Sequence, residues 1–325
     1  MANIERGVLP GNDKVCKVGD GVFAVDTDYV RPRQDASHLV VDSGKAAFVD
    51  TGTNHSVANL EAALRTLGLD ALDVEYLFLT HVHLDHAGGA GLLAQRCPRA
   101  QVLVHPRGAP HLIDPAKLIA GTRAVYGDAA YQKMYGDIRP IPAERVSAMQ
   151  DGEERRLGAR SFRFLHTPGH ALHHLCIVEQ AAGVVFSGDT YGVSYREFDN
   201  DNGEFVMVTT TPTQFDPEQL HASVRRIQQL RPRSVYMTHY SRVDQVQRLG
   251  EDLHADIDRH VAIALAHAVR SDREERIRAD LQEHFERRLE RHGYVGGERQ
   301  RHMLLDDDVA LNATGLVSWL SRRAA

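Results

Sequence analysis

The stretch Thr80-His81-Val82-His83-Leu84-Asp85-His86-Ala87-Gly88-Gly89 places four groups able to bind a transition metal within six residues. In an extended segment side chains point the same way at every second residue, so His81 and His83 share a face, while a turn into the glycines swings Asp85 and His86 to a second position. A polar surface loop is the alternative, but three imidazoles beside a carboxylate would repel one another if protonated and would have no structural task. The stretch therefore predicts a metal site with ligands for two ions.

Three later apolar runs each end in a further residue able to bind a metal. These residues are His170, Asp189 and His239, which follow the runs at 162–165, 184–186 and 235–237. In α/β architectures a ligand site lies beyond the ends of the strands, where loops carry functional side chains on a rigid base. One such histidine alone would more often be a hydrogen-bonded core or surface residue. Together with the first stretch, the three indicate one shared site.

Composition argues for a globular chain with a sizeable core and against nucleic-acid binding. Of the 325 residues 42% are hydrophobic, and the formal net charge is −6. Binding a phosphate backbone needs a clustered basic face, which this balance does not offer. We therefore expect a small-molecule substrate and no nucleic-acid partner.

Cysteine usage and the apolar runs bear on location. Cys16, Cys97 and Cys176 are odd in number, far apart and without a CxxC pair, so we expect packing residues in a reducing compartment. Residues 1–21 carry charges and glycines without a continuous apolar core, unlike a signal peptide. No run approaches the ~18 apolar residues of a membrane span. These features predict a cytoplasmic chain without a membrane partner.

Hydrophobic periodicity predicts alternating strands and helices over the first three quarters of the chain. The expected strands lie at 22–25, 38–41, 46–49, 76–79, 101–104, 161–165, 175–178, 184–186 and 234–237, and the expected helices at 56–67, 91–96 and 217–230. The last helix has a clear start, with Asp216 as the N-cap and Pro217 at the first helical position. The pattern is interrupted at 107–149, where we expect an inserted pair of helices joined near Gly121, whose tyrosines overhang a pocket or, more simply, pack the insertion onto the domain.

From Gly250 onward the sequence is helical. One apolar stripe is expected at Leu253, Ile257, Val261, Leu265 and Ala268, a second at Ile277, Leu281, Phe285 and Leu289, and a last helical segment at 304–320. We therefore expect a catalytic domain at 1–249 with the insertion at 107–149, and a helical extension at 250–325. The extension could cap the core, line the pocket or support a homodimer.

The motifs resemble the five-part pattern of the metallo-β-lactamase fold superfamily. The matching parts are His81-x-His83-x-Asp85-His86, the Pro-Gly-His that ends at His170, the Gly-Asp that ends at Asp189, the late His239, and Asp50 in Phe48-Val49-Asp50-Thr51-Gly52. The resemblance implies an α/β fold, a four-layer αββα sandwich with a dinuclear site at one edge. The segment beyond about residue 250 lies outside it.

Carried over by position, the resemblance assigns each ligand. The first metal would take His81, His83 and His170, the second would take Asp85, His86 and His239, and Asp189 would bridge the two. Asp50 would support the ligand loop by hydrogen bonds. Imidazoles and carboxylates without a thiolate suit two zinc ions, with iron, manganese or cobalt as alternatives.

Such a site predicts hydrolysis. Two cations that share an oxygen lower its pKa from ~15.7 toward ~7 and polarise a carbonyl or phosphoryl oxygen. Asp85 and Asp189 are the expected catalytic residues, and Asp85 could also pass a proton to the leaving group. True β-lactamases of the superfamily lack the bridging aspartate, so the resemblance favours the glyoxalase II and lactonase-like branches. We predict a metal-dependent hydrolase that uses a hydroxide held by two metal ions to cleave a small ester, thioester or lactone.

Other activities of the same fold remain as alternatives. A mononuclear iron persulfide dioxygenase, an oxidoreductase, would use only His81, His170 and Asp189. A flavodiiron oxidase would need a flavin-binding domain. A nuclease or phosphodiesterase would need a basic arm or clamp, which the acidic balance does not provide.

Substrate contacts are expected around the mouth of the site. The polar loop from Tyr191 to Pro212 begins two residues after Asp189, and a phenol of Tyr191 or Tyr195 could hydrogen-bond a developing oxyanion. His174 could reach substrate or support a ligand. For each of these residues a packing role, or for His174 a role at the start of the next strand, is the competing interpretation.

Overall fold

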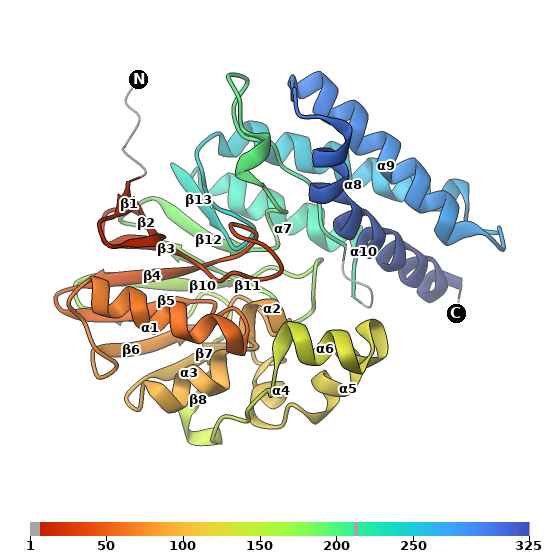
Figure 1. Ribbon diagram of the computed structural model, residues 1–325. Coiled ribbons are helices and arrows are strands. Elements are labelled where there is room, and N and C mark those ends of the chain that lie inside the picture. Colours follow the sequence, from red (N-terminus) through yellow and green to blue (C-terminus); the bar gives the residue numbers. More distant parts are fainter. Residues whose placement is uncertain (1–6, 211–213, 325) are drawn as a thin grey trace. The chain divides into compact units, whose positions relative to one another are not determined.

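The computed structural model describes residues 7–210 and 214–324 (Figure 1). Within them the chain forms two compact units whose segments alternate in sequence. The first unit comprises the described parts of Met1–His166, His173–Gly188 and Arg233–Arg242, and the second comprises those of Thr167–Leu172, Asp189–Pro232 and Val243–Ala325. The domain boundary expected between residues 249 and 250 falls inside a helix of the second unit, α8 (Val246–Ala266).

A large sheet forms the N-terminal part of the first unit. Its strands follow one another in sequence order: β1 (Val8–Leu9), β2 (Asn12–Gly19), β3 (Val22–Asp26), β4 (Ala36–Asp42), β5 (Lys45–Val49), β6 (Val74–Phe78), β7 (Gln101–Val104) and β8 (Val146–Ala148). The strands from β1 to β5 pair antiparallel, whereas β5 to β8 pair parallel. The three parallel pairs need crossovers, which α1 (Val57–Thr66), α3 (Ala90–Arg96) and, between β7 and β8, the helices of the 107–149 insertion supply.

A second sheet follows. Its order is β14 (Ser241–Val243), β13 (Ser234–Met237), β12 (Val184–Gly188), β11 (Leu175–Glu179), β10 (Arg160–His166) and β9 (Glu154–Leu157). Here only β12 and β13 are parallel among the pairs whose register is resolved. The predicted strands are present, while β1, β2, β8, β9 and β14 were not predicted because they are short, charged or irregular.

The layers of the first unit are visible in strand β6. Leu77 packs with α1 and α3 on one face of the large sheet, and Phe78 packs on the other face against Phe162 and Phe164 of the second sheet. Neighbouring side chains of a strand point to opposite faces, so a fully buried strand reads as a continuous apolar run. In Figure 1 α1 and α3 lie along the sheet that contains β5, β6 and β7. The expected two-sheet α/β core is thus confirmed.

The insertion at 107–149 differs from the prediction in its helices. It contains α4 (Ala109–Ile113), α5 (Ala116–Tyr126), α6 (Asp128–Tyr135) and a single 3-10 turn, η2 (Ala143–Arg145), before β8. The break falls at Gly127, whose φ of 78° favours glycine, whereas Gly121 lies inside α5. Tyr131 and Tyr135 are buried and cluster with Leu84 of the ligand stretch. Packing of the insertion onto the domain is therefore the role that these two tyrosines take.

The second unit is mainly helical. It contains η3 (Arg196–Phe198), α7 (Pro217–Gln229), α8, α9 (Arg273–His292) and α10 (Glu298–Ala324), the last three drawn in blue tones in Figure 1. Helix α7 begins as predicted, because the Asp216 side chain accepts a hydrogen bond of 3.0 Å from the backbone N–H of Gln219. The described part of the loop from Tyr191 ends at Thr210, and residues 211–213 of the expected entrance loop lie outside the described residues.

The apolar stripes of the extension were predicted in part. The stripe of α9 at Ile277, Leu281, Phe285 and Leu289 is fully buried, as expected. In α8 Leu253 and Ile257 are buried but Leu265 is 48% exposed, because the buried face continues through His260 and Ile263 instead. Helix α10 also extends beyond the predicted 304–320 at both ends. Hydrophobic periodicity did not predict this buried face of α8, because the polar residues Asp256 and His260 occupy core positions.

Candidate metal centre

The ligand stretch follows strand β6 at the edge where parallel strands end. Strands β5 and β6 are parallel, so Asp50, directly after β5, lies beside Thr80, which follows β6. The short helix α2 (Leu84–Ala87) then turns the chain. His81 and His86 are fully buried, whereas the side chain of Asp85 keeps 21% of its surface exposed. The sheet thus carries the stretch on a rigid base.

Asp50 joins three strand ends of the first unit. One carboxylate oxygen, Oδ1, accepts a hydrogen bond of 2.8 Å from the Thr80 N–H, and Oδ2 accepts bonds of 2.8 Å from the Thr80 and Thr238 hydroxyls. Oδ2 also lies 2.8 Å from Nδ1 of His86. The carboxylate is fully buried. It therefore supports the ligand stretch from behind, in the place that the resemblance implies.

Asp85, His86 and His239 form a compact group of metal-ligand type. Their three ligand atoms lie within 4.8 Å of one another, with Nε2 of each histidine 3.7 Å from Oδ2 of Asp85. The rear nitrogen of each ring faces a buried carboxylate, because His86 Nδ1 contacts Asp50 and His239 Nδ1 lies 2.6 Å from Oδ1 of Asp35. Carboxylates in this position fix a metal-binding imidazole in orientation and tautomer. The group presents Nε2 of both histidines toward Asp85.

Asp35 is a candidate site residue that the sequence did not indicate. Burial raises the pKa of this carboxyl to about 6, while the nearby His239 acts in the opposite direction. Thr238 was also missed as a contact of Asp50. Nothing in the sequence around Asp35 distinguishes it from a polar residue before a strand. Its neighbour His239 is 204 residues away along the chain, so only the fold pairs them.

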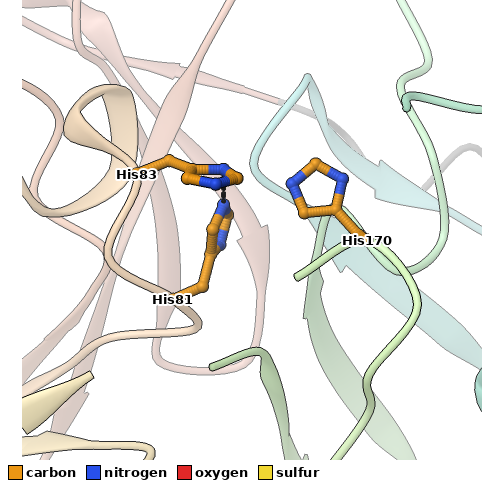
Figure 2. Close-up of side chains that lie close together, drawn as sticks. All are labelled: His81, His83 and His170. Carbon is orange, nitrogen blue, oxygen red and sulfur yellow. Dashed lines mark hydrogen bonds between the residues drawn. The ribbon is translucent and has the colours of Figure 1, made fainter. Parts of the chain in front are cut away.

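His81 and His83 form a second pair in the first unit. Nε2 of His81 lies 2.8 Å from Nδ1 of His83, the contact drawn as a dashed line in Figure 2. His174 stacks on His81 with ring centroids 4.8 Å apart, and His173 lies edge-on to His83 at 5.4 Å. His174, predicted as a substrate or supporting contact, therefore lies against a predicted ligand.

The end of β12 approaches the same residues. Gly188 has a φ of 48°, and a Cβ at this position would lie 2.6 Å from the Thr80 hydroxyl and 2.7 Å from Nε2 of His174. Only glycine allows this close approach. Close contacts within the first unit thus explain why a glycine precedes Asp189.

The second unit holds the other two predicted ligands. Nε2 of His170, the third residue drawn in Figure 2, lies 3.2 Å from Oδ2 of Asp189. Gly169, before His170, has a φ of 127° and passes so close to α7 that a Cβ would lie 2.3 Å from the Leu220 nitrogen. The Gly169 carbonyl also accepts a hydrogen bond of 2.8 Å from the Asp216 N–H. The Pro-Gly-His sequence is therefore held by the start of α7.

Tyr191 and Tyr195 are both buried in the second unit. The Tyr191 hydroxyl donates a hydrogen bond of 2.6 Å to the Val246 carbonyl, and the Tyr195 hydroxyl donates one of 2.8 Å to Asp308. Their donors are thus engaged within the unit. These bonds favour the packing interpretation over the predicted contact with a substrate oxyanion.

The donor chemistry of these residues fits divalent metal ions. Imidazole nitrogens and carboxylate oxygens suit zinc, iron, manganese or cobalt. The cysteines contribute no disulfide among the described residues, and Cys97 and Cys176 are buried as packing residues. A carboxylate behind the ring, as His86 and His239 each have, is the usual partner of a metal-binding imidazole.

Comparisons with known proteins give the family. The model of the metallo-beta-lactamase superfamily matches residues 30–239, more than half of the chain. A metallo-beta-lactamase fold-containing protein of Sulfurisphaera tokodaii is 31% identical over 196 residues, which is 59% of this chain and 67% of the relative. An atrochrysone carboxyl ACP thioesterase of Aspergillus fumigatus is 25% identical over 242 residues, 73% of this chain and 59% of the relative.

A solved structure extends the similarity of fold. The metallo-beta-lactamase family protein from Thermus thermophilus superposes with a TM-score of 0.67 at 19% identity, covering 95% of this chain and 96% of that chain. In the described part of the sequence, no helix combines the length and the apolar character needed to cross a membrane. With the matched region containing the ligand stretch and running to His239, the chain belongs to the metallo-β-lactamase superfamily.

Proposed function

We propose that the chain is a metal-dependent hydrolase that cleaves an ester, thioester or lactone in a small molecule. The observation that carries the proposal is the pair of carboxylates, Asp50 and Asp35, behind His86 and His239. A carboxylate behind the ring is the usual partner of a metal-binding histidine, and here both histidines of the group that contains Asp85 have one. The superfamily match supports the same reading.

In the proposed site the first ion would be held by His81, His83 and His170, the second by Asp85, His86 and His239, with Asp189 shared by both. Zinc is the ion that we propose, with iron or manganese as the alternatives to test. When bound, two such ions lower the pKa of water and polarise a substrate carbonyl oxygen.

Residues of this chain then perform the supporting steps. Asp50 and Asp35 hold the imidazoles of His86 and His239 so that Nε2 is the binding nitrogen. Asp85 is the most solvent-accessible of the carboxylates in the first unit's group, at 21% side-chain exposure against 0% for Asp50 and Asp35. We therefore assign to Asp85 the transfer of a proton to the leaving group.

Among the three bonds we place the thioester first. One relative is named as a thioesterase that acts on an acyl carrier protein, although the match spans only 59% of its length. The net charge of −6 gives no support to a nucleic-acid substrate. The glyoxalase II or lactonase-like branch, a homodimer and a cytoplasmic location stay predictions.

The test begins with protein purified without added metal. We expect close to two equivalents of zinc by elemental analysis, and hydrolysis in a panel of thioesters, lactones and phosphodiesters with thioesters fastest. One equivalent of iron with oxygen uptake on a persulfide, and no hydrolysis, would instead establish the dioxygenase alternative and refute the proposal.

Variants of single ligands test the site itself. His81→Ala and Asp189→Ala should each lose metal and turnover while the circular dichroism spectrum is retained. His302→Ala is the matched control, because this exposed histidine of α10 pairs with Glu298 and Asp306 of its own helix. Full metal content in both ligand variants would show that the assignment is wrong.

A further inference from the structure

A short stretch of the second unit, Val206 to Thr210, is held by the C-terminal helices; we call it the 206–210 segment. Arg288 of α9 donates a hydrogen bond of 2.8 Å to the Val206 carbonyl. The Val208 N–H donates one of 2.8 Å to Oδ2 of Asp256 on α8. Val206 and Val208 are buried, so these backbone groups depend on the helices for their partners.

Asn312 of α10 holds the same segment at its end. Its side-chain N–H donates a hydrogen bond of 3.1 Å to the Val208 carbonyl, and its Oδ1 accepts one of 2.7 Å from the Thr210 N–H. The Thr210 hydroxyl also donates to the Asn312 carbonyl at 3.0 Å. Asn312 is only 2% exposed. An amide with both a donor and an acceptor is the side chain that can satisfy these two backbone groups together.

The residue between these two anchors faces a predicted metal ligand. The carbonyl of Thr209 lies 3.5 Å from Nδ1 of His170, in a long hydrogen bond that the ring N–H donates. Val208 and Thr210 turn their backbone groups to Asn312, and in an extended segment the residue between them faces the other way. Nε2 of the same ring faces Asp189 at 3.2 Å.

We propose that α8, α9 and α10 position His170 through the 206–210 segment, with Asn312 as the main positioning residue. The helices fix the Thr209 carbonyl, which accepts from Nδ1 of His170 and so orients the ring with Nε2 toward Asp189; with an ion on Nε2, the ring proton stays on Nδ1. The inference rests on the proposed function, since that assigns His170 as a ligand. It gives the extension, which lies outside the superfamily match, a role in the site.

The group of Asp256, His260 and His284 on α8 and α9 serves the same arrangement rather than a metal of its own. Its ligand atoms lie within 4.8 Å of one another. However, Asp256 already contacts His284 at 2.6 Å and Arg288 at 2.9 Å, besides the Val208 N–H. A buried guanidinium against the only carboxylate of the group balances its charge and disfavours a cation there.

The experiment uses the full-length, nitrogen-labelled protein at saturating zinc, because in the metal-free protein the Asp189 carboxylate, 3.2 Å from Nε2 of His170, competes for the ring proton. Long-range proton–nitrogen correlation spectra at mildly alkaline pH report which ring nitrogen of His170 carries the proton, and His170→Gln identifies the signal. In the parent the proton should lie on Nδ1. In Asn312→Leu we expect a mixture of both tautomers, and zinc affinity from chelator competition about 10- to 100-fold weaker.

The control lies on the same helix. Thr314→Val removes the 2.9 Å hydrogen bond from α10 to Glu274 of α9 but does not touch the 206–210 segment, so it should keep the parent tautomer and affinity. A merely structural role of Asn312 would lower the melting temperature without changing the tautomer.

Two outcomes overturn the inference. The first is a folded Asn312→Leu with the proton still on Nδ1 and zinc affinity within twofold of the parent. The second applies if that variant does not fold. Asn312→Asp then replaces it, because this substitution keeps the acceptor for Thr210 and loses only the donor to Val208, and a tautomer population equal to the parent's overturns the inference. If the parent itself binds no zinc, the proposed function is refuted; if the parent binds zinc and the Asn312 variants match it, only this inference is.

Discussion

At the scale of single residues, Asp50 shows how one buried carboxylate can organise a site. It accepts hydrogen bonds from Thr80, Thr238 and His86, which follow different strands or turns of the first unit. Every one of these groups is a donor, so an acceptor-only side chain satisfies all of them. Hydrogen bonds to a charged acceptor are also shorter and stronger than those to a neutral one.

Replacing this carboxylate by an amide tests its role. In Asp50→Asn one oxygen becomes an NH₂ group that meets a donor of Thr80, Thr238 or His86. We expect the free energy of unfolding to fall by about 1–3 kcal/mol and metal affinity to fall by about 10- to 100-fold. Denaturant titration measures the first quantity, and competition with a chromogenic chelator measures the second.

Asp73→Asn is the control for this substitution. Asp73 accepts a hydrogen bond from the Asp70 N–H in an exposed turn, so the same chemical change there should leave metal affinity unchanged. Equal metal affinity in Asp50→Asn and the parent would contradict the role that we assign to Asp50.

Predictability at this scale depends on whether the residue type is itself informative. His81 to His86 could be singled out as candidate ligands because clustered imidazoles are rare without a task, and Asp50 because it belongs to a known pattern. Asp35 and Asn312 could not, since an aspartate before a strand or an asparagine in a helix is ordinary until the fold supplies its neighbours.

At the scale of elements, the N-cap of α7 can be tested by its energetics. Asp216→Ala removes the acceptor for the Gln219 N–H but leaves the backbone bond from Asp216 to Gly169 in place. We expect a loss of about 1 kcal/mol in the free energy of unfolding, with unchanged metal content. Asp216→Asn should recover most of the loss, and a metal content reduced in proportion would show that α7 positions His170 through its cap.

The buried imidazole of His260 on α8 predicts a dependence of stability on pH. Burial lowers its pKa from 6.5 to about 4, with the charges of Arg288 and His284 acting the same way and that of Asp256 opposing. The unfolded chain therefore takes up a proton below pH 6.5 that the folded chain resists until about pH 4. The stability that this residue contributes is complete above pH 6.5 and is lost as pH falls from 6.5 to 4.

His260→Gln removes this proton uptake. Across the same pH range its free energy of unfolding should fall less steeply than the parent's, by up to about 1.4 kcal/mol per pH unit for one proton. Urea titrations at a series of pH values measure the slope. His302→Gln serves for comparison. The pKa of the exposed His302 is raised by Asp306, so this variant should not make the free energy of unfolding fall less steeply at acid pH. Parallel curves for His260→Gln and the parent would contradict the prediction.

The bounds of helices and strands were predicted correctly where the hydrophobic periodicity of the sequence was regular. Strand β7 and the start of α7 have the predicted bounds, whereas the insertion breaks at Gly127 and not at Gly121. Both glycines interrupt the pattern equally well in sequence. Only the backbone shows that Gly127 needs a positive φ while Gly121 continues a helix.

At the scale of the whole molecule, metal removal should reduce stability. Metal ions that bind only the folded chain stabilise it by mass action. With free zinc about 100-fold above its Kd this contribution is about 2.7 kcal/mol, or roughly 5 °C in melting temperature for a chain of this size. Differential scanning fluorimetry before chelation, after it and after return of zinc measures the change.

His81→Ala should show no such response to zinc, because one ion loses a ligand. If the parent melts at the same temperature with and without chelator, the metal does not bind the folded chain and the proposed function fails.

The interleaved division into two units could not be predicted from the sequence, because the crossings at residues 166, 172, 188, 232 and 242 carry no linker-like composition.

The anchoring of the 206–210 segment by Asn312 also has a consequence for synthesis on the ribosome. Thr210 and its partner Asn312 are separated by 102 residues. At about 5–20 residues per second, the segment waits on the order of ten seconds for α10 to be made. During that interval a nascent chain has His170 and Asp189 but lacks the helix that completes their surroundings. Helix α10 must therefore be synthesised before the 206–210 segment can reach its final arrangement.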